Sequence, residues 1–591
     1  MKVSDYIIDF VASLGVRHCY VVQGGAVAHM IDSIGARNDI SYICVGHEQA
    51  GAIAAHGYAA QKDGFACAIA TTGPGIMNLV NGVACLHYDS YPSLFLGGQV
   101  TTARYKAKEL GVRQLGFQES PHADLLRPVT KYSNTVTDKS RVRYELEKAV
   151  YLAREGRPGP VFLDFCDDVQ RADINPAELE SFVPPKAKDG QDLNAAAQQL
   201  FKLLEKAERP ALLLGGGLRI GGHGPAAVAL GEKLGIPILT TWGAKDCLPH
   251  DHELNAGMFG LHGSRAGNFA VQNADCVIGL GVRFTQHQTG TPASTFARGA
   301  TKVVVEIDPA ELAKFPAIDM KIDLPVEGDA GKFIAAVASR QAPKLPDYAP
   351  WRKRIQEWRA RYAIKPGTPA KGSNPYAAIA ALSEVAKSGD IILGDVGATL
   401  SWMFQAWKVK QGQSLLTSFN NHTMGYAVPG GMGAALALAK DNRKQTVWSL
   451  NGDGGILMNI QEFGVLAVHK LPVKVVILNN HGYGVIQQTQ EDYFDSRYHA
   501  TTPKTGLMDP DFVAMARSFG LPAMSIASEK DLQSGLAEFA KQSGPGLCVI
   551  EIDPTARIQP AVTGGRPIEE IAPALPAEEF ARNMIVPPLS R

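Results

Sequence analysis

The chain has 591 residues, of which 45% are hydrophobic and 20% charged, as is ordinary for a globular protein of about three or four domains. Lys and Arg total 58, as do Asp and Glu, so the sequence gives no electrostatic reason to expect nucleic acid or an anionic membrane as a partner. The eight cysteines form no CxxC pair, which favours buried thiols over a zinc site or disulfide framework. With no signal-peptide pattern and no bilayer-spanning apolar run, we expect a cytoplasmic protein.

Residues 1–185 alternate short apolar runs with helical patterns, which predicts a doubly wound parallel α/β domain. Two turns after predicted strands hold candidate catalytic residues. Gly25 precedes a helix, where its backbone N–H could stabilise a developing oxyanion. Glu48 lies in the first turn of another helix. The local pattern alone equally allows a carboxylate there that only interacts with the helix dipole.

Polar linkers that contain proline divide the rest of the chain. After a linker near 184–192, residues 193–343 predict a second α/β domain, with a strand that ends in Gly215-Gly216-Gly217. A glycine-rich turn after a strand suggests nucleotide binding, although the signal is weak by itself. Residues 365–560 predict a third α/β domain, and residues 561–591 form a C-terminal tail. The predicted fold class is therefore α/β, with three doubly wound parallel-sheet domains.

The strongest pattern lies at 446–484. An apolar run, the turn Asn451-Gly452-Asp453-Gly454-Gly455, a helical pattern and a second apolar run predict a βαβ unit. Asp453 and Asn480 then leave the same carboxyl edge of a parallel sheet, where ligands bind. Their oxygens suit Mg²⁺ if phosphate oxygens and water complete its octahedron. Glycine N–H groups at the helix start suit the phosphate.

This spacing, with Met458-Asn459, Glu462 and Leu471-Pro472-Val473 between the two ligands, resembles the signature of thiamine diphosphate enzymes. The resemblance implies that Asp453, Asn480 and the carbonyl oxygen of Gly482 bind the metal. It further implies that the three domains are, in order, pyrimidine-binding, central and diphosphate-binding.

The segment Gly46-His47-Glu48-Gln49-Ala50, followed by His56-Gly57-Tyr58-Ala59, resembles the activating-glutamate motif of the same family. The resemblance implies that Glu48 hydrogen-bonds the aminopyrimidine of the cofactor and promotes ylid formation. A carboxyl group in an apolar pocket has a raised pKa, which suits proton exchange near neutral pH.

Residues 111–118 and 128–132 resemble the acetohydroxyacid synthase (acetolactate synthase) branch, which implies that Gln118 lies near the thiazolium. A solvated loop glutamine is the alternative. Met424 corresponds to the residue that wedges between the cofactor rings in that branch, with a gap-filling core methionine as the alternative. The implied cofactor contacts are Gly397, Ala398, Thr399, Met424, Gly452, Asp453, Gly454, Gly455, Asn480, Gly482, Tyr483 and Gly484.

Four stretches of the predicted central domain match, in order, the FAD-contacting stretches of acetohydroxyacid synthases: residues 259–263, 279–284, 306–309 and 327–330. The resemblance implies bound FAD, without a redox role in the net reaction, although some family members keep this domain without a ligand. The implied flavin contacts are Arg157, Gly216, Gly217, His262, Gly281, Arg283, Glu306 and Asp329.

Thiamine diphosphate chemistry begins with loss of CO₂ from a 2-oxo acid, with pyruvate as the expected donor. The acyl carbanion equivalent that remains then reacts with a proton, a carbonyl acceptor or an electron acceptor. The paired histidines of several simple decarboxylases are not recognisable here, which favours a carboligase. Acetolactate formation and simple decarboxylation are the alternatives. The enzyme would accordingly be classed as a transferase or a lyase.

The acceptor side departs from true acetohydroxyacid synthases at two positions. His287 takes the place of an arginine that clamps the acceptor carboxylate, and Thr489 takes the place of a tryptophan. Loss of a guanidinium removes a bidentate anion site, and loss of tryptophan opens volume. Both changes favour a bulkier, neutral ketone or aldehyde acceptor. Further segments resemble a subgroup that transfers acetyl from pyruvate to ketones, including nucleotide-linked keto sugars.

The family's subunit interface joins the glutamate of one chain to the metal site of another, which implies a homodimer or homotetramer. A non-catalytic paralogue that serves as a binding partner is the alternative, and the presence of Glu48, Asp453 and Asn480 argues against it.

Overall fold

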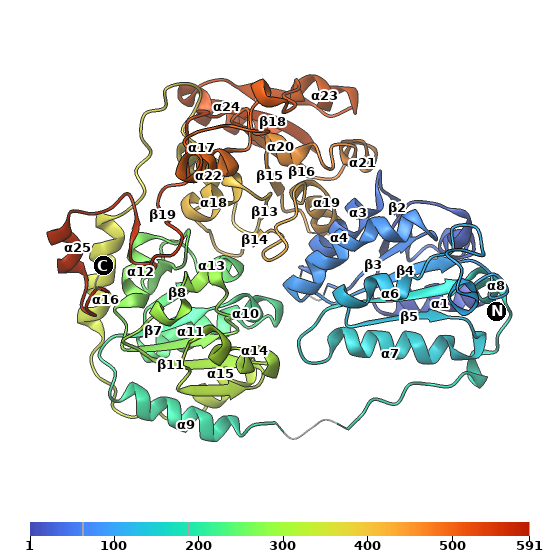
Figure 1. The fold of residues 1–591 in the computed structure, drawn as a ribbon, viewed down its shortest axis with the longest axis horizontal. Coiled ribbons are helices and arrows are strands. Elements are labelled where there is room, and N and C mark those ends of the chain that lie inside the picture. Colours follow the sequence, from blue (N-terminus) through green and yellow to red (C-terminus); the bar gives the residue numbers. More distant parts are fainter. Residues whose placement is uncertain (62–63, 187–189, 442, 590–591) are drawn as a thin grey trace.

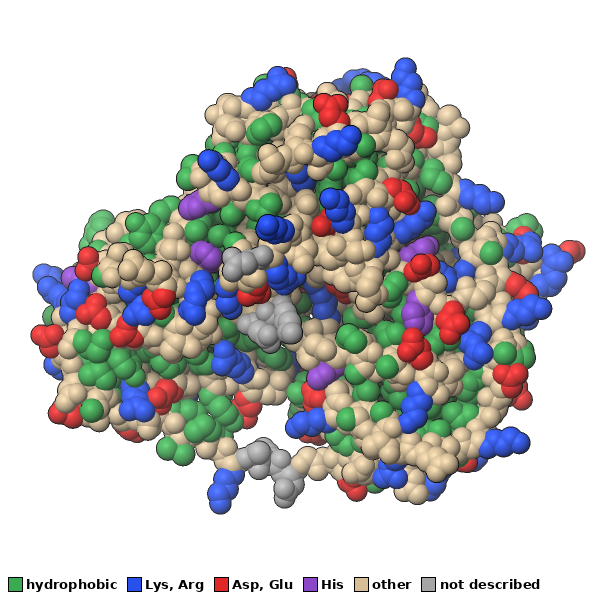
Figure 2. Space-filling model, turned by 180° about the vertical axis from the view of Figure 1, so that it is seen from behind, with side chains coloured by type: hydrophobic (Ala, Val, Ile, Leu, Met, Phe, Trp, Pro, Cys, Tyr) green, Lys and Arg blue, Asp and Glu red, His purple; other side chains and the backbone are tan. Residues whose placement is uncertain are grey.

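Three six-stranded parallel sheets, each flanked by helices, make up the computed structural model, which describes residues 1–61, 64–186, 190–441 and 443–589 (Figure 1). This arrangement confirms the expected fold class of three doubly wound α/β domains. Among the described residues, no helix is both long and apolar enough to cross a membrane. Basic and acidic side chains are interspersed over the face shown in Figure 2.

The first sheet has the strand order β2-β1-β3-β4-β6-β5. Its strands are β1 (His18–Val21), β2 (Ser41–Cys44), β3 (Ala66–Ala70), β4 (Ser93–Gln99), β5 (Tyr132–Val136) and β6 (Pro160–Cys166). The helices of this domain are α1 (Val3–Ser13), α2 (Ala28–Gly35), α3 (Glu48–Ala59), α4 (Pro74–Asp89), α5 (Ala107–Leu110), α6 (His122–Leu126), α7 (Val142–Arg154) and α8 (Asp167–Arg171). The connections reverse direction between β1 and β3, so the loops after these two strands border a crevice.

The central sheet has the order β12-β11-β10-β7-β8-β9. Its strands are β7 (Pro210–Leu214), β8 (Ile238–Thr240), β9 (Asn255–Met258), β10 (Cys276–Leu280), β11 (Thr301–Glu306) and β12 (Leu324–Glu327). Its helices are α9 (Leu193–Leu204), α10 (Gly216–Ile220), α11 (Gly224–Leu234), α12 (Arg265–Gln272), α13 (Gln286–Thr289), α14 (Pro309–Ala313) and α15 (Ala330–Ala338). Here the reversal lies between β7 and β10. An added Cβ at Gly215 would lie 2.0 Å from the carbonyl oxygen of Gly281, so the two turns touch backbone to backbone.

The third sheet has the order β14-β13-β15-β16-β18-β17. Its strands are β13 (Ile391–Gly394), β14 (Ser414–Leu416), β15 (Val447–Gly452), β16 (Val473–Asn479), β17 (Ala523–Ile526) and β18 (Gly546–Glu551). Its helices are α17 (Pro375–Val385), α18 (Ala398–Ala406), α19 (Ala427–Lys440), α20 (Asp453–Ile456), α21 (Glu462–His469), α22 (Gly484–Tyr493), α23 (Phe512–Ser518) and α24 (Leu532–Lys541). The reversal lies between β13 and β15. Gly452 pairs with Leu478, so the ends of β15 and β16 lie at one edge.

The C-terminal segment returns to the central domain. It forms β19 (Ala561–Val562), β20 (Ile571–Ala572) and α25 (Ala577–Asn583), and α25 lies beside the linker helix α16 (Ala349–Arg361) in Figure 1. Trp358 on α16 donates its indole N–H to Asn583, and the buried Asn273 donates to the backbone carbonyl of the same residue. Little in the sequence pattern of this segment indicated such docking.

Helices α3 and α19 join the first and third domains through their backbones. A Cβ added at Gly57 would lie 1.9 Å from the carbonyl oxygen of Gly430, and one added at Gly433 would lie 1.9 Å from that of Ala54. Because such distances leave no room for any side chain, glycine is required on both helices. Small residues therefore set how closely the two domains approach.

We expect Gly433→Ala to lower the thermal unfolding midpoint, because the new methyl group would meet the Ala54 carbonyl and force the helices apart. Overpacking of this kind destabilises by about 1–3 kcal/mol. The matched control is Gly35→Ala on α2, where an added Cβ meets nothing within 4 Å. Calorimetry that gives equal midpoints for the two variants would contradict this account of the interface.

Candidate cofactor and active site

The crevice between β13 and β15 in the third domain is built from glycine-rich turns. Gly397 caps α18 with φ of 82°, and an added Cβ there would meet nothing within 4 Å. Gly452 caps α20, and its added Cβ would lie 3.3 Å from the hydroxyl oxygen of Thr399. Two helix starts therefore lie side by side at the sheet edge, next to open space. Unpaired N–H groups at helix starts bind anions such as phosphate.

The three residues predicted to bind the metal lie together beside these helix starts. The carboxylate of Asp453 accepts hydrogen bonds from the N–H groups of Gly454 (2.8 Å) and Gly482 (2.7 Å). The amide of Asn480 donates to the carbonyl oxygen of Gly482 at 3.0 Å. The side chains of Asp453 and Asn480 are buried, and burial raises the pKa of Asp453 to about 6. A divalent cation here would favour the ionised carboxylate.

This donor set fits magnesium. One carboxylate, one amide oxygen and one backbone carbonyl are hard oxygen ligands, and Mg²⁺ commonly completes its octahedron with substrate phosphates and water. No group of three or more His, Cys, Asp or Glu side chains that could hold a metal occurs among the residues described. An ion in this place would therefore depend on the mixed set that the sequence predicted: Asp453, Asn480 and Gly482.

Asp395 fastens the segment that carries Met424 to the same crevice. Its buried carboxylate accepts hydrogen bonds from the N–H groups of Gly425 (3.0 Å) and Tyr426 (3.3 Å). An added Cβ at Gly455 would lie 2.1 Å from Asp395 Oδ2. Burial raises the pKa of Asp395 to about 7. The sequence assigned no role to Asp395, because its partners lie about thirty residues away and no local pattern joins them.

Tyr483 lies against the metal-site turn. An added Cβ at Gly454 would lie 2.0 Å from the Tyr483 ring, and Gly484 starts α22 directly behind it. The glycine at 454 therefore admits the aromatic ring. The predicted positions 452–455 and 480–484 consequently form one continuous surface at the carboxyl ends of β15 and β16.

Glu48 begins α3 at the edge of the first domain. It is 9% exposed, and its carboxylate accepts a hydrogen bond from the amide of Asn78 on α4 at 2.9 Å. An added Cβ at Gly75 would lie 3.1 Å from Glu48 Oε1. His47 caps the helix through its Nδ1, which accepts the N–H of Gln49. The sequence analysis did not identify Asn78 as a partner of Glu48. Its position one turn into α4 could have indicated that it lies near the crevice.

A direct hydrogen bond connects the Glu48 segment to the third domain. The N–H of Gly46 donates to the carboxylate of Glu462 on α21 at 3.0 Å. Burial raises the pKa of Glu462 to about 7, and the bond from Gly46 opposes this shift. Glu48 contacts residues of its own domain, whereas Asp453, Asn480 and Gly482 contact one another. One chain therefore holds two half-sites that are linked through Gly46 and Glu462.

Gly25 and Gln118 both lie at the crevice of the first sheet. Gly25 starts a short 3₁₀ turn after β1, and an added Cβ there would meet nothing within 4 Å. Its neighbour Gly24 packs on Thr71, which follows β3. Gln118 has φ of 62°, and its carbonyl accepts the hydroxyl of Thr72 at 3.1 Å. The backbone of Gln118 is thus held against the turn after β3.

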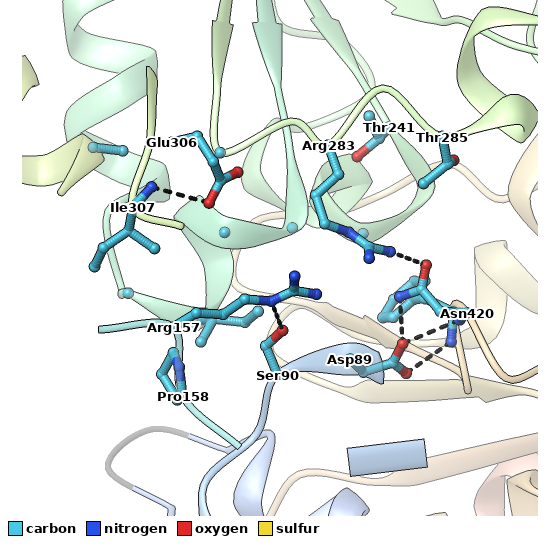
Figure 3. A pocket seen from close by; sticks show the side chains of 18 of the residues that line it. Asp89, Ser90, Arg157, Pro158, Thr241, Arg283, Thr285, Glu306, Ile307 and Asn420 are labelled. Atoms are coloured by element: carbon cyan, nitrogen blue, oxygen red, sulfur yellow. Dashed lines mark hydrogen bonds between the residues drawn. The ribbon is translucent and has the colours of Figure 1, made fainter. Parts of the chain in front are cut away.

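A large cavity opens at the crevice of the central sheet, between β7 and β10 (Figure 3). It is closed on its other sides by residues 88–91 and 156–158 of the first domain and by Phe419 and Asn420 of the third. The predicted flavin contacts that line it are Arg157, Gly216, Gly217, Gly281, Arg283, Glu306 and Asp329. His262 is not among the lining residues. It stacks on Trp242, which does line the cavity, with ring centroids 5.9 Å apart.

Two arginines, Arg157 and Arg283, line this cavity. Arg157 bonds to Ser90 and Glu311, both at 2.8 Å, and Arg283 bonds to Asn420 (Figure 3). Burial and the nearby Arg157 lower the pKa of Arg283. Two guanidinium groups that face one cavity favour an anionic group such as a diphosphate.

Glu306 ends β11 at the far side of the cavity. Its Oε1 accepts the N–H groups of Ile307 at 2.9 Å and Asp308 at 3.2 Å, and burial raises its pKa. Its position at the end of the strand next to β10 is where dinucleotide-binding sheets place the acid that accepts ribose hydroxyl groups.

Three imidazoles and an indole gather where the cavity meets the third domain. Ring centroids of Trp242 lie 4.4 Å from His287 and 6.2 Å from His422, and His262 lies 5.1 Å from His287. Burial lowers the pKa of His287 to about 3, that of His262 to about 4 and that of His422 as well. The cluster is therefore uncharged near neutral pH.

Thr489, the other position at which the sequence departs from the family, lies on the exposed face of α22. Its hydroxyl donates to the backbone carbonyl of Val485.

The three domains match three family models in order. Residues 1–125 match the N-terminal TPP-binding domain of thiamine pyrophosphate enzymes, residues 197–337 match the central domain, and residues 395–552 match the C-terminal TPP-binding domain. The two half-sites lie in the first and last of these matches. Fold and site together define the class as the thiamine pyrophosphate enzymes.

Relatives match along nearly the whole chain. "Acetolactate synthase large subunit" of Parasynechococcus marenigrum is 34% identical over 95% of this chain and 89% of its own length. "Probable acetolactate synthase large subunit" of Methanocaldococcus jannaschii is 33% identical over 96% and 94%. "Acetolactate synthase isozyme 1 large subunit" of Escherichia coli is 30% identical over 95% and 96%. The chain belongs to this family and is an acetolactate synthase-like enzyme that depends on thiamine diphosphate.

Proposed function

We propose that the enzyme is a thiamine diphosphate- and Mg²⁺-dependent carboligase, which decarboxylates a 2-oxo acid such as pyruvate and transfers the acyl unit to a ketone or aldehyde. The observation that carries the proposal is the hydrogen-bonded cluster of Asp453, Asn480 and Gly482 beside two helix starts. When bound, thiamine diphosphate supplies a carbon centre that adds to the 2-oxo acid and stabilises the acyl carbanion left after CO₂ departs.

The protein residues then have distinct roles. Asp453 and Asn480 hold the metal, and the turns at Gly397 and Gly452 bind phosphate through backbone N–H groups. Glu48, held by Asn78, accepts and returns a proton at its carboxylate, away from bulk water. An added Cβ at Gly25 would meet nothing within 4 Å, so the backbone borders open space at the first crevice, and its N–H is the candidate to stabilise negative charge on a substrate oxygen.

A second copy of the chain would complete each site. Support comes from the separate hydrogen-bond partners of the two candidate half-sites within one chain, and from exposed apolar side chains close to candidate site residues in the sequence. Phe117, next to Gln118, is 83% exposed, and Met458, in the turn after α20, is 47% exposed. We propose a homodimer or homotetramer in which Glu48 of one chain faces Asp453 of another, in a cytoplasmic protein.

The test is CO₂ release from pyruvate, measured with and without ketone acceptors. Glu48→Gln keeps the hydrogen bond to Asn78 but cannot exchange a proton, so turnover should fall by about 10²–10⁴-fold. Isothermal titration should show that the variant still binds thiamine diphosphate with Mg²⁺. The control is Glu109→Gln, an exposed residue of α5. Absence of CO₂ release by the unaltered protein, whatever the acceptor, would refute the proposal.

We also propose that FAD occupies the central cavity. Arg157 and Arg283 suit its diphosphate, the buried Glu306 suits its ribose, and the glycines 216, 217 and 281 leave room for a close approach to the backbone. The flavin would have a structural role, because the net reaction transfers no electrons.

The visible absorption spectrum of the purified protein should show flavin bands. Arg157→Met should reduce the flavin retained per chain, because the diphosphate loses a cationic partner. Arg171→Met, on the exposed end of α8, should retain the same amount. A colourless protein that does not take up added FAD would show that the cavity does not bind flavin.

The acceptor that fits best is a neutral carbonyl compound. His287 occupies the predicted place of the carboxylate clamp, and burial keeps it and its neighbour His262 uncharged. An uncharged aromatic cluster gives no ion pair to a 2-oxo acid, but it can pack against and hydrogen-bond a larger ketone. Formation of acetolactate is the second candidate, favoured by the names of the relatives, which are acetolactate synthases.

We expect His287→Arg to shift acceptor preference from neutral ketones towards pyruvate by about tenfold or more, since a charged hydrogen bond contributes about 1.5–3 kcal/mol. Chiral analysis of products from mixed acceptors measures the ratio. The control is His469→Arg at the exposed end of α21. An unaltered enzyme that already makes mainly acetolactate, with no change in the variant, would favour the second candidate.

A further inference from the structure

A fully buried histidine, His122, lies near Gln118 and takes no part in the proposed reaction described above. His122 begins α6 and is 0% exposed, as are Asp164 on β6 and Gln99 at the end of β4. The Nε2 of His122 lies 2.9 Å from the backbone nitrogen of Gly73, and its Nδ1 lies 2.9 Å from Asp164 Oδ2. Four segments that are distant in sequence thus meet at one imidazole.

The hydrogen-bond partners define the protonation of this imidazole. A backbone N–H can only donate, so Nε2 of His122 is an acceptor and carries no proton. Nδ1 therefore carries the proton and donates to Asp164. The amide of Gln99 donates to the same oxygen at 3.0 Å and to the carbonyl of Ser120 at 2.9 Å. The other oxygen of Asp164 has no hydrogen-bond partner among the described residues. The side chains of His122 and Gln99 therefore supply the hydrogen bonds that this carboxylate accepts.

The network holds the turn that supports Gln118. The Oε1 of Gln99 lies 3.2 Å from the hydroxyl of Thr72, which also lies 3.1 Å from the carbonyl of Gln118. Gly73 has φ of 71°, and its added Cβ would lie 3.0 Å from Gln118 Cβ. His122 thus fixes Gly73 from one side, and Gln118 packs on it from the other.

Gln118 needs such support, because its own backbone is strained. A φ of 62° is unusual for a residue with a side chain, and the surrounding contacts must offset its cost. The next residue, Glu119, anchors the loop on the other side by accepting the N–H groups of Ala107, Leu115 and Gly116, each at 2.8 Å. Burial would raise the pKa of Glu119, but these backbone hydrogen bonds outweigh it and lower the pKa.

We propose that His122 is a positioning residue for the decarboxylation. Paired with Asp164, it holds the Thr72–Gly73 turn and so sets the strained backbone from which the Gln118 side chain enters the site. The proposal rests on the proposed function for its catalytic consequence. Gly73 also caps α4, whose Asn78 holds Glu48, so the same network supports two of the three candidate catalytic residues of the first domain, Gln118 and Glu48.

The first experiment is a double-mutant cycle on CO₂ release from pyruvate by the cofactor-loaded enzyme. We expect His122→Leu to lower kcat by about tenfold with little change in KM, because binding groups remain while Gln118 is misplaced. His122→Gln, whose Oε1 can replace Nε2 as acceptor for Gly73, should recover most of the activity. His122→Leu combined with Gln118→Ala should be no slower than Gln118→Ala alone. The control Leu146→Ala, in the core of the same domain, should lower stability without this kcat effect.

A second measurement does not depend on activity. Hydrogen–deuterium exchange should become at least tenfold faster in His122→Leu for peptides that contain Gly73 and Gln118, and stay unchanged at β15. Unchanged exchange at both peptides, or kcat effects that multiply independently in the cycle, would overturn the proposal. If the unaltered protein releases no CO₂, the proposed function fails by itself, and the exchange measurement still decides whether His122 holds Gln118.

Discussion

The point where a parallel sheet reverses the direction of its connections is the constraint on which the site depends. In each sheet one pair of neighbouring strands has connections that leave in opposite directions: β1 and β3, β7 and β10, β13 and β15. No crossover covers the carboxyl ends of such a pair, and helix starts border the gap with unpaired N–H groups. All three candidate ligand regions lie at these places, which is why glycines rather than larger residues occupy the turns.

The second constraint is the rigid joint between the first and third domains. Because α3 and α19 touch through backbone atoms at Gly57 and Gly433, neither helix can slide without a clash. Buried polar contacts add direction to this contact: His56 bonds to Tyr426, and Asp89 accepts the backbone N–H groups of Phe419 and Asn420. The joint therefore fixes the position of the Glu48 segment relative to the third domain, which carries Asp453.

Sequence patterns predicted the features that depend on short spacing. Asp453 and Asn480 follow consecutive strands of one βαβ unit, so their meeting could be inferred from the chain order. The contacts that position Met424 and Gln118 could not be inferred in this way, since they join separate segments of the chain. Asp395 holds the Met424 segment, and His122 holds the turn of Gln118, through hydrogen bonds that leave no periodic pattern.

The cavity of the central domain could be inferred from the sequence, whereas the docking of the C-terminal segment could not. Glycine-rich turns after strands indicated the cavity, because such turns are local. The docking of α25 on α16 combines polar contacts, such as Trp358 to Asn583, with the packing of Phe580 and Met584 on the core of the central domain, and these contacts join residues far apart in sequence. His262 was assigned to the flavin on the basis of its neighbours in sequence, but its ring turns towards Trp242 and lies outside the cavity lining.

The electrostatic character of the acceptor side follows from burial rather than from residue type alone. A histidine in place of an arginine could still carry a positive charge and bind a carboxylate. Here His287 lies between two other imidazoles and an indole, and a proton on it would have to be buried beside groups that cannot neutralise it. Its pKa is therefore held far below neutrality. In the role proposed for it, His287 would thus lack the charge as well as the guanidinium geometry of an arginine, and a carboxylate beside it would lose water without gaining an ion pair from it.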